Sequence, residues 1–288
     1  MADRTSGGNY VNHDIRSNNG KYIVMPPYKA GQDGWGNLKI PNVCLDGGDI
    51  AMQYPVNTKF VDFDRTHIYG YCYSRGEATV KANIGLMNQS VKETVTWGAT
   101  AGVAGDTLVS IDGTTLDDET TADANIFAGG YLMPRTNPYS DYRIISNTSY
   151  IGGSVSATEM DIVIENGLTA AVVAAVASCY LDRNPFAKMR HQWGATAECR
   201  RSVVGVTLID PTASTYQWVQ TWGPIHMPSD EQMGSADWLQ SAYFNSDGSI
   251  QAGSSVDLSS TRQDQYAGYA IGSTTSAMTW FLCLQLER

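Results

Sequence analysis

The strongest constraint on the fold is the stretch at residues 216–224, where aromatic and β-branched side chains alternate with amides and a hydroxyl. A period of two places successive side chains on opposite faces, which is typical of a half-buried β-strand. The pair Gly223-Pro224 follows the alternation, and we expect the strand to stop at a turn there. Because no catalytic constellation accompanies the pattern, the sequence informs on architecture more than on chemistry.

Similar patterns recur from about residue 58 onward, as short alternating or continuous apolar runs that predict further strands. The predicted strands are 60–63, 107–111, 142–145, 161–165, 203–209, 216–222 and 280–286. Turn-forming pairs such as Asp112-Gly113 and Asp247-Gly248 lie between them. Many short strands separated by turns predict a mainly β fold, an antiparallel β-sandwich or β-barrel.

The first 57 residues differ from the rest in having little periodicity and many glycines and prolines, which predicts an extended N-terminal arm. Residues 58–288 then form a β-rich domain. Its length also allows two sub-barrels, at about 58–180 and 181–288.

Two stretches are candidates for helix. Residues 168–177 fit two or three helical turns and a buried strand equally well, because Val172, Val173 and Val176 favour β structure. Ser229 could cap a short helix that runs toward Met233. Neither stretch changes the predicted fold class.

A polar residue, Trp and Gly recur together at Trp97, Trp193 and Trp222. This echo has two interpretations, a duplicated β unit or three strands that end in the same kind of turn.

The chain is acidic, with a formal net charge of -10, and only 17% of its residues are charged. Phosphate binding needs clustered Lys and Arg, so this balance argues against a general affinity for nucleic acid. One local group is basic and is interpreted as a solvated or partner-facing surface. It consists of Arg183, Lys188, Arg190, His191, Arg200 and Arg201.

The five cysteines are widely spaced, odd in number and without a C-x-x-C pair, which predicts free thiols instead of a disulfide framework. They are Cys44, Cys72, Cys179, Cys199 and Cys283. Cys179 and Cys283 follow or interrupt apolar runs, so we expect both to pack as small hydrophobic residues in a core.

No arrangement of residues predicts catalysis, a metal ion or a cofactor. The four histidines, His13, His67, His191 and His226, are far apart, and His67 is expected to be a hydrogen-bonded structural residue on a strand. Among the carboxylates, Asp62 and Asp64 are the acid/base candidates to test first. If both lie on one strand face, as residues i and i+2, they are roughly 6–7 Å apart. We therefore expect a protein that is not an enzyme.

Tyr and Trp together number 23, against only 6 Phe. Both side chains carry a polar group on an apolar body, which suits half-exposed positions and interfaces. Packing within strands and subunit contacts are the favoured interpretation, and a platform of exposed rings for carbohydrate is the alternative.

The N-terminal residues lack the apolar stretch of a signal peptide, so no export is expected by that route. The longest apolar run, residues 168–181, is too short and too weakly apolar to span a bilayer. We expect no contact with a membrane.

Five segments in the region from about residue 60 onward share a further pattern of glycines, aromatic residues and strand formers. They are Asn125–Leu132, Tyr142–Asn147, Asn184-Pro185-Phe186, Trp218–Pro224 and Gly268–Gly272. Together they resemble segments of virion structural proteins of tailed bacteriophages, particularly marine and cyanobacterial ones.

The resemblance implies a β-rich structural protein of the virion, made in the host cytoplasm. It implies a head decoration or cement protein that binds the major capsid protein and copies of itself, as a homo-oligomer such as a trimer. The alternative is a tail or fibre component that recognises a glycan or another receptor. A virion-associated hydrolase that uses Asp62 or Asp64 is a third hypothesis.

Overall fold

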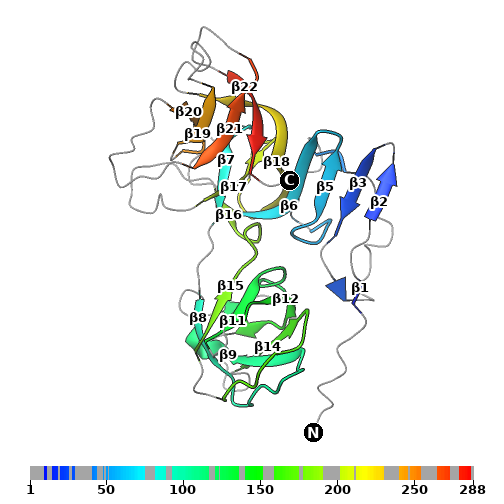
Figure 1. The fold of residues 1–288 in the computed structure, drawn as a ribbon, viewed down its shortest axis with the longest axis vertical. Coiled ribbons are helices and arrows are strands. Elements are labelled where there is room, and N and C mark those ends of the chain that lie inside the picture. Colours follow the sequence, from blue (N-terminus) through cyan, green and yellow to red (C-terminus); the bar gives the residue numbers. More distant parts are fainter. Residues whose placement is uncertain are drawn as a thin grey trace. The chain divides into compact units, whose positions relative to one another are not determined.

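The computed structural model of this chain shows an all-β protein. The residues that it describes are 10–11, 15–18, 20–25, 28–29, 41–43, 48, 50, 52–74, 82–88, 93–116, 121–122, 124–135, 140–151, 159–174, 178–190, 202–210, 212–229, 240–245, 247–253, 265–272 and 279–286. Within them the one complete helical element is a 3-10 turn, Gly113–Thr115, and almost all strand pairs are antiparallel (Figure 1). The predicted mainly β, antiparallel sandwich or barrel class is confirmed.

The chain folds into two compact units that interleave along the sequence. The first unit comprises Met1–His13, Pro26–Gly36 and Ser90–Ala187. The second unit comprises Asp14–Met25, Asn37–Gln89 and Lys188–Arg288. The sequence suggested consecutive halves at 58–180 and 181–288, whereas here the first unit interrupts the second.

The first unit contains a closed barrel with the strand order β11-β12-β14-β9-β8-β15. Its strands are β8 (Glu93–Trp97), β9 (Leu108–Asp112), β11 (Tyr131–Pro134), β12 (Tyr142–Asn147), β14 (Glu159–Ile164) and β15 (Ser178–Asp182). Four short strands pair outside the barrel: β1 (Tyr10–Val11) with β4 (Tyr28–Lys29), and β10 (Thr121–Ala122) with β13 (Tyr150–Ile151). Alternate residues of β14, Met160, Ile162 and Ile164, are buried, because a small barrel fills its interior with side chains.

The second unit contains twelve strands in the order β2-β3-β5-β6-β16-β7-β17-β18-β22-β21-β19-β20. The first six are β2 (Ile15–Asn18), β3 (Lys21–Val24), β5 (Lys59–Asp62), β6 (Arg65–Ser74), β16 (Met189–Arg190) and β7 (Gly85–Asn88). The other six are β17 (Val203–Thr207), β18 (Thr215–Pro228), β22 (Thr279–Gln285), β21 (Tyr266–Ala270), β19 (Ser241–Phe244) and β20 (Ile250–Ala252).

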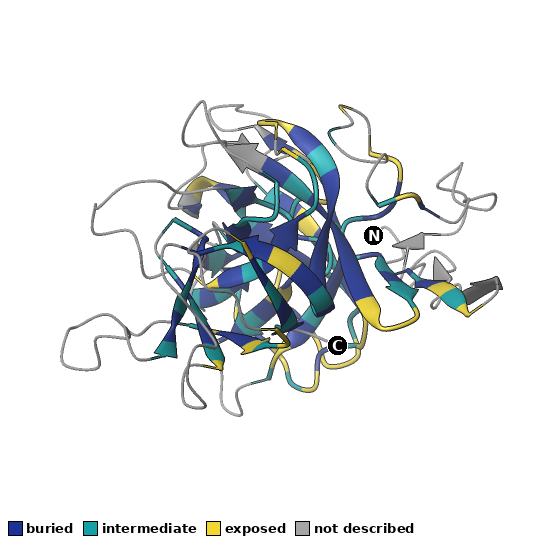
Figure 2. Ribbon diagram, turned by 90° about the horizontal axis from the view of Figure 1, so that it is seen from above, coloured by how far each residue is buried: buried dark blue, intermediate teal, exposed yellow. Residues whose placement is uncertain are grey.

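An additional pairing of β6 with β18 closes five of these strands into a ring, β6-β16-β7-β17-β18. The pair β16–β6 is parallel, and the other pairs of the ring are antiparallel. A second core of buried residues includes Ile225 of β18, Phe244 of β19 and Trp280 of β22. Buried positions recur along many of the strands (Figure 2).

Strand β18 corrects the expectation of a turn at Gly223-Pro224, because the strand continues to Pro228. Its first half pairs with β6, and its second half pairs with β22 from Trp222 onward. Gly223 has φ +94, and a Cβ there would lie 2.1 Å from the carbonyl oxygen of Asp64. The glycine therefore forms an irregularity at which the strand changes partners without ending.

The other boundary predictions fall into three groups. Residues 168–174 are neither helix nor strand, although Val172 exchanges two backbone hydrogen bonds with Gly102, at 2.9 and 3.0 Å. The proposed helix after Ser229 lies outside the described residues. The described parts of residues 1–57, expected to form an arm, include the hairpin β2–β3, which extends the sheet beside β5.

Candidate functional site

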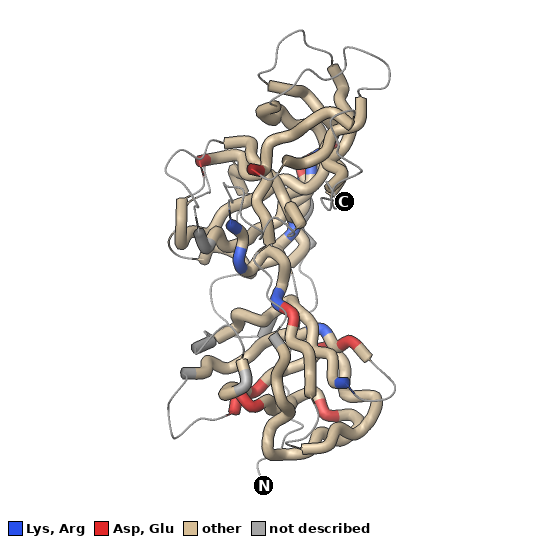
Figure 3. Tube along the Cα trace, turned by 90° about the vertical axis from the view of Figure 1, so that its left-hand side faces the viewer, with Lys and Arg blue, Asp and Glu red and all other residues tan. Residues whose placement is uncertain are grey.

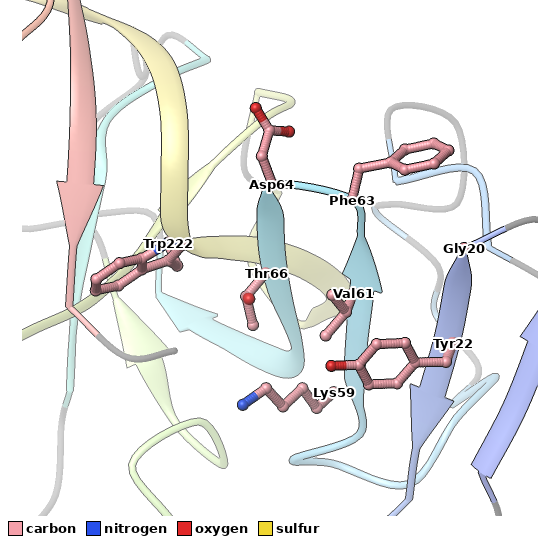
Figure 4. A pocket seen from close by; sticks show the side chains of 8 residues that line it. All are labelled: Gly20, Tyr22, Lys59, Val61, Phe63, Asp64, Thr66 and Trp222. Carbon is pink, nitrogen blue, oxygen red and sulfur yellow. The ribbon is translucent and has the colours of Figure 1, made fainter.

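A groove of about 280 Å³ opens in the second unit, where β18 separates from β6. The hairpins β2–β3 and β5–β6 and the bend of β18 contribute its walls (Figure 4). Alternation along β3, β5 and β6 places Tyr22, Lys59, Val61 and Thr66 on this face of the sheet. The opposite face packs against the core of the unit.

The tip of the β5–β6 hairpin is strained and exposes an aromatic ring. Asp62 pairs with Arg65, so Phe63 and Asp64 form the two-residue loop. Phe63 has φ +57, and its side chain is 70% exposed. Two-residue hairpin loops with a positive φ strongly favour Gly, Asn or Asp, so a bulky apolar residue here is unfavourable in both conformation and hydration.

The Phe63 ring lies against the tip of the neighbouring β2–β3 hairpin. A Cβ on Gly20, whose φ is +83, would lie 2.9 Å from a ring carbon, so the ring lies directly against the glycine backbone. The ammonium of Lys21 lies 5.8 Å from the ring centroid and forms a salt bridge of 3.0 Å with Asp62. Through these contacts the two hairpin tips lie side by side at the groove.

The side-chain amide of Gln220 stabilises the bend of β18 on the other side of the groove. Its Nε2 lies 3.0, 3.2 and 3.1 Å from the carbonyl oxygens of Trp222, Gly223 and Pro224. Gln220 itself is 1% exposed. A buried amide donor thus adds hydrogen bonds to three consecutive carbonyl groups at the bend of the strand.

The groove carries both hydrogen-bond donors and acceptors. Figure 4 shows the Tyr22 hydroxyl, the Lys59 side chain and the Thr66 hydroxyl on one side of the β5–β6 hairpin, while Asp64 projects from its tip. Among the described residues of the lining, one ammonium and one carboxylate balance each other in charge. Such a lining suits a neutral polar ligand better than a phosphate or a cation.

The two carboxylates singled out in the sequence do not form an acid/base pair. Asp62 ends β5 and binds Lys21, whereas Asp64 lies in the loop beyond Phe63. The expectation that both lie on one strand face is wrong, because the chain reverses between them.

His67 is structural but is not hydrogen-bonded as expected. It is 1% exposed, neither ring nitrogen has a partner of good geometry, and its ring stacks on Phe60 at 5.9 Å. Burial lowers the pKa of His67 to about 4, although Asp62 and the nearby Phe60 carbonyl favour the charged form. The imidazole is therefore neutral near pH 7.

No metal site is found in the part of the chain that the structure describes. His226 is exposed, with its ring tilted against that of Phe281 at a centroid distance of 4.8 Å, and His13 and His191 lie outside the described residues. The described part also has no helix with the length and apolar character needed to cross a bilayer.

The free-thiol prediction holds for three cysteines, and Cys44 and Cys199 lie outside the described residues. Burial raises the pKa of Cys72 to about 11 and that of Cys179 to about 12, so both thiols are protonated and unreactive near neutral pH. Cys283 is only half-buried, so the expectation that it packs in a core is wrong. It lies on β22 opposite the exposed Tyr269 of β21.

The predicted basic surface is not exposed where it is described. Arg183 is 4% exposed, and its guanidinium lies over the Phe127 ring at 5.2 Å. Lys188 and Arg190 are half-buried, and the other three members lie outside the described residues. Charged side chains are sparse along the described trace (Figure 3).

The tryptophans confirm the packing interpretation only in part. Trp97, Trp218 and Trp280 are at most 1% exposed, and Trp218 packs against Tyr54, Phe60 and Tyr69. Trp222 is half-buried at the groove, and it lies within β18, not at a strand end. The interpretation of three strands that end in the same kind of turn is therefore wrong at Trp222, and Trp193 lies outside the described residues.

Sequence reasoning missed the groove because its walls come from residues 20–22, 59–66 and 222, which only the fold brings together. One local signal was available: Phe63-Asp64 occupies a two-residue loop where turn-forming residues are expected.

Comparisons with protein-family models, with curated proteins and with solved structures found no match to this chain.

Proposed function

We propose that this chain is a non-enzymatic structural protein of a tailed-bacteriophage particle, where it acts as a decoration or cement protein on the head. Its partners are the major capsid protein and further copies of the chain. The segments that resemble phage virion proteins contribute to the framework of both units. Phe127 and Leu132 are buried in the barrel, and Trp218 lies in the aromatic cluster of the second unit.

The observation that carries the proposal is the edge of the second unit's sheet. Strand β2 is the first strand of the twelve, and within the described residues its one neighbour is β3. An edge strand offers backbone N–H and C=O groups to another chain, which can add a strand. A cement protein needs such a contact, because it joins neighbouring subunits through complementary surfaces repeated by symmetry.

The low charge of the chain supports the same proposal. Only 17% of the residues are charged, so broad faces can be buried against a neighbour with few charged groups to desolvate. Asp62 and Asp64, the two carboxylates singled out in the sequence, do not lie on one strand face.

A proline on β2 tests the edge contact directly. Asn18 pairs with Lys21 across a two-residue loop, so the N–H of the next residue, Ser17, points away from β3. Ser17→Pro therefore removes an outward donor while sparing the ladder within the unit. We expect the purified variant to keep its melting temperature but to show reduced occupancy on heads produced without the chain, measured by cosedimentation.

The matched control is Thr212→Pro, in an exposed loop of the same unit. It should fold and bind heads as the unchanged protein does. Equal occupancy for Ser17→Pro and the unchanged protein would contradict the role of the β2 edge.

A further inference from the structure

We infer that the groove that runs along the β2–β3 and β5–β6 hairpins to the bend of β18 is a saccharide-binding site, in which Tyr22 and Phe63 present aromatic surfaces and Asp64, Lys59 and Thr66 present polar groups. This site goes beyond a structural role in the particle. It gives the second unit the ability to recognise a hydroxylated ligand wherever the protein is located.

The first argument is the unfavourable state of Phe63. A bulky residue with φ +57 is conformationally strained, and leaving 70% of its side chain exposed adds an unfavourable hydration term. Glycine at this position would remove both effects. A strained and exposed aromatic ring at the rim of a groove is explained if the ring contacts a ligand.

The second argument is that Phe63 is supported from behind. Gly20 leaves room for one edge of the ring, and Lys21 lies 5.8 Å from its centroid while bound to Asp62. The ring is thus held at a defined place beside the groove. A ring that is already positioned loses little conformational entropy when a ligand binds. The lower entropic cost raises the affinity for ligands that make few contacts.

The third argument is the chemistry of the lining. The C–H groups of a pyranose ring pack on the electron-rich face of an aromatic ring, and its hydroxyl groups both donate and accept hydrogen bonds. Tyr22, which is 37% exposed, supplies an aromatic surface and a hydroxyl. The Asp64 carboxylate accepts, the Lys59 ammonium donates, and the Thr66 hydroxyl does either.

Size and charge narrow the ligand class further. A volume of about 280 Å³ accommodates a ligand of one or two sugar rings, and it is small for an extended peptide. The opposite charges of Lys59 and Asp64 do not favour an anion. The acidic chain as a whole, at -10, also disfavours phosphorylated ligands.

The test is a titration of the full chain with neutral monosaccharides and their short oligomers: glucose, galactose, mannose and N-acetylglucosamine. Binding is followed by calorimetry and by amide shifts in NMR spectra. We expect at least one member of the panel to bind with millimolar or tighter affinity and to shift amides of residues 20–22 and 59–66. Inorganic phosphate serves as the anionic probe, and we expect it not to bind.

The decisive variant is Phe63→Gly, because glycine tolerates the positive φ and the protein should keep its melting temperature or gain a little. We expect the affinity for the sugar to fall roughly tenfold or more. Tyr22→Ala should weaken binding similarly, and Asp64→Asn should change which sugar is preferred. Tyr131→Ala, on a 49% exposed aromatic of the first unit, is the matched control and should bind normally.

Three results would overturn the inference. They are no binding by any sugar in the panel, binding that Phe63→Gly leaves unchanged, and a preference for inorganic phosphate over sugars. None of these results bears on the β2 edge, so the two proposals fail independently.

Discussion

Each of the two units closes part of a sheet into a ring of strands, but the strand pairings that close the ring differ. The six-stranded barrel of the first unit closes with antiparallel pairs throughout and an apolar interior. The second unit closes its five-stranded ring through a strand that changes partners, with one parallel pair and several register shifts. The barrel also has one register shift, between β12 and β14, and a close approach of Gly130 to the backbone of Asp182. The ring of the second unit differs in its parallel pair and in the strand β18, which serves two partners in succession.

The two units also differ in how many polar residues they bury. Among the described residues, the first unit buries few of them, and Ser110 and Asn147 are hydrogen-bonded there. The second unit buries more, and in two of them, His67 and Gln217, no side-chain polar atom has a described partner. We therefore expect the second unit to be the more sensitive to conservative changes and to pH.

The largest expected effect is that of Gly223→Ala. The new Cβ would lie 2.1 Å from a backbone oxygen of Asp64, and φ +94 is unfavourable for alanine. We expect the second unit to lose about 4 kcal/mol of unfolding free energy. Denaturant unfolding, monitored by hydrogen exchange, would assign the loss of unfolding free energy to this unit.

Its control is Gly105→Ala in the first unit, where φ is +95 and nothing lies within 4 Å of the new Cβ. That change isolates the cost of the backbone conformation, about 1 kcal/mol. Equal losses at the two positions would show that the close approach at Gly223 does not matter.

The next effect is a dependence on pH. The pKa of His67 is lowered from 6.5 to about 4 in the folded chain, so between these values the unfolded state binds a proton that the folded state does not. Stability is then complete above pH 6.5 and falls as the pH decreases toward 4, by roughly 3 kcal/mol. Urea unfolding of the second unit at several pH values measures it.

The variant His67→Phe keeps an aromatic ring beside Phe60 and removes the titrating group. Its stability should lose most of this slope between pH 6.5 and 4, whereas His226→Gln, at an exposed position, should keep it. A slope that survives His67→Phe would assign the pH dependence to another group.

A smaller effect separates two buried glutamines of β18. Gln220→Met removes the donor to three carbonyl groups at the bend and should destabilise the second unit by about 2 kcal/mol. Gln217→Met replaces an amide whose two polar atoms lack described partners. It should be neutral or stabilising by about 1 kcal/mol in thermal unfolding.

If both substitutions destabilise equally, an ordered water satisfies Gln217, and the contrast between the two positions disappears.

The smallest effect is expected in the regular barrel. Ile162→Val removes one methylene group from an interior position that is 0% exposed and should cost about 1 kcal/mol in the first unit only. Hydrogen exchange should show increased opening of β9, β12 and β14, with the second unit unchanged. A loss in both units would mean that they unfold together.

Local pattern predicted the strands whose burial alternates. Tyr142–Asn147, Glu159–Ile164 and Thr279–Gln285 match their predicted positions within two residues at each end, because apolar alternation directly reports a half-buried strand. The two-residue strand Met189–Arg190 pairs with β6 on one side and β7 on the other. It is too short to show apolar alternation in the sequence.

The features that the sequence predicted wrongly or did not predict are those that depend on tertiary contacts. Gly223-Pro224 has the composition of a turn, yet the approach of Asp64 and the amide of Gln220 keep the strand going through it. The groove depends on the same bend together with two distant hairpins, so no local pattern contains it. Asp62 and Asp64 looked like neighbours on one face because the turn at Phe63 was not recognised.

The most direct test of the proposed role is to locate the chain in the particle. Cryo-EM maps of particles made with and without the chain would be subtracted, with wild-type occupancy measured by quantitative mass spectrometry. We predict difference density in regular array on the outer surface of the head, with lower stability of heads that lack it. Density confined to the tail or fibres, or absence of the chain from purified particles, would contradict the account.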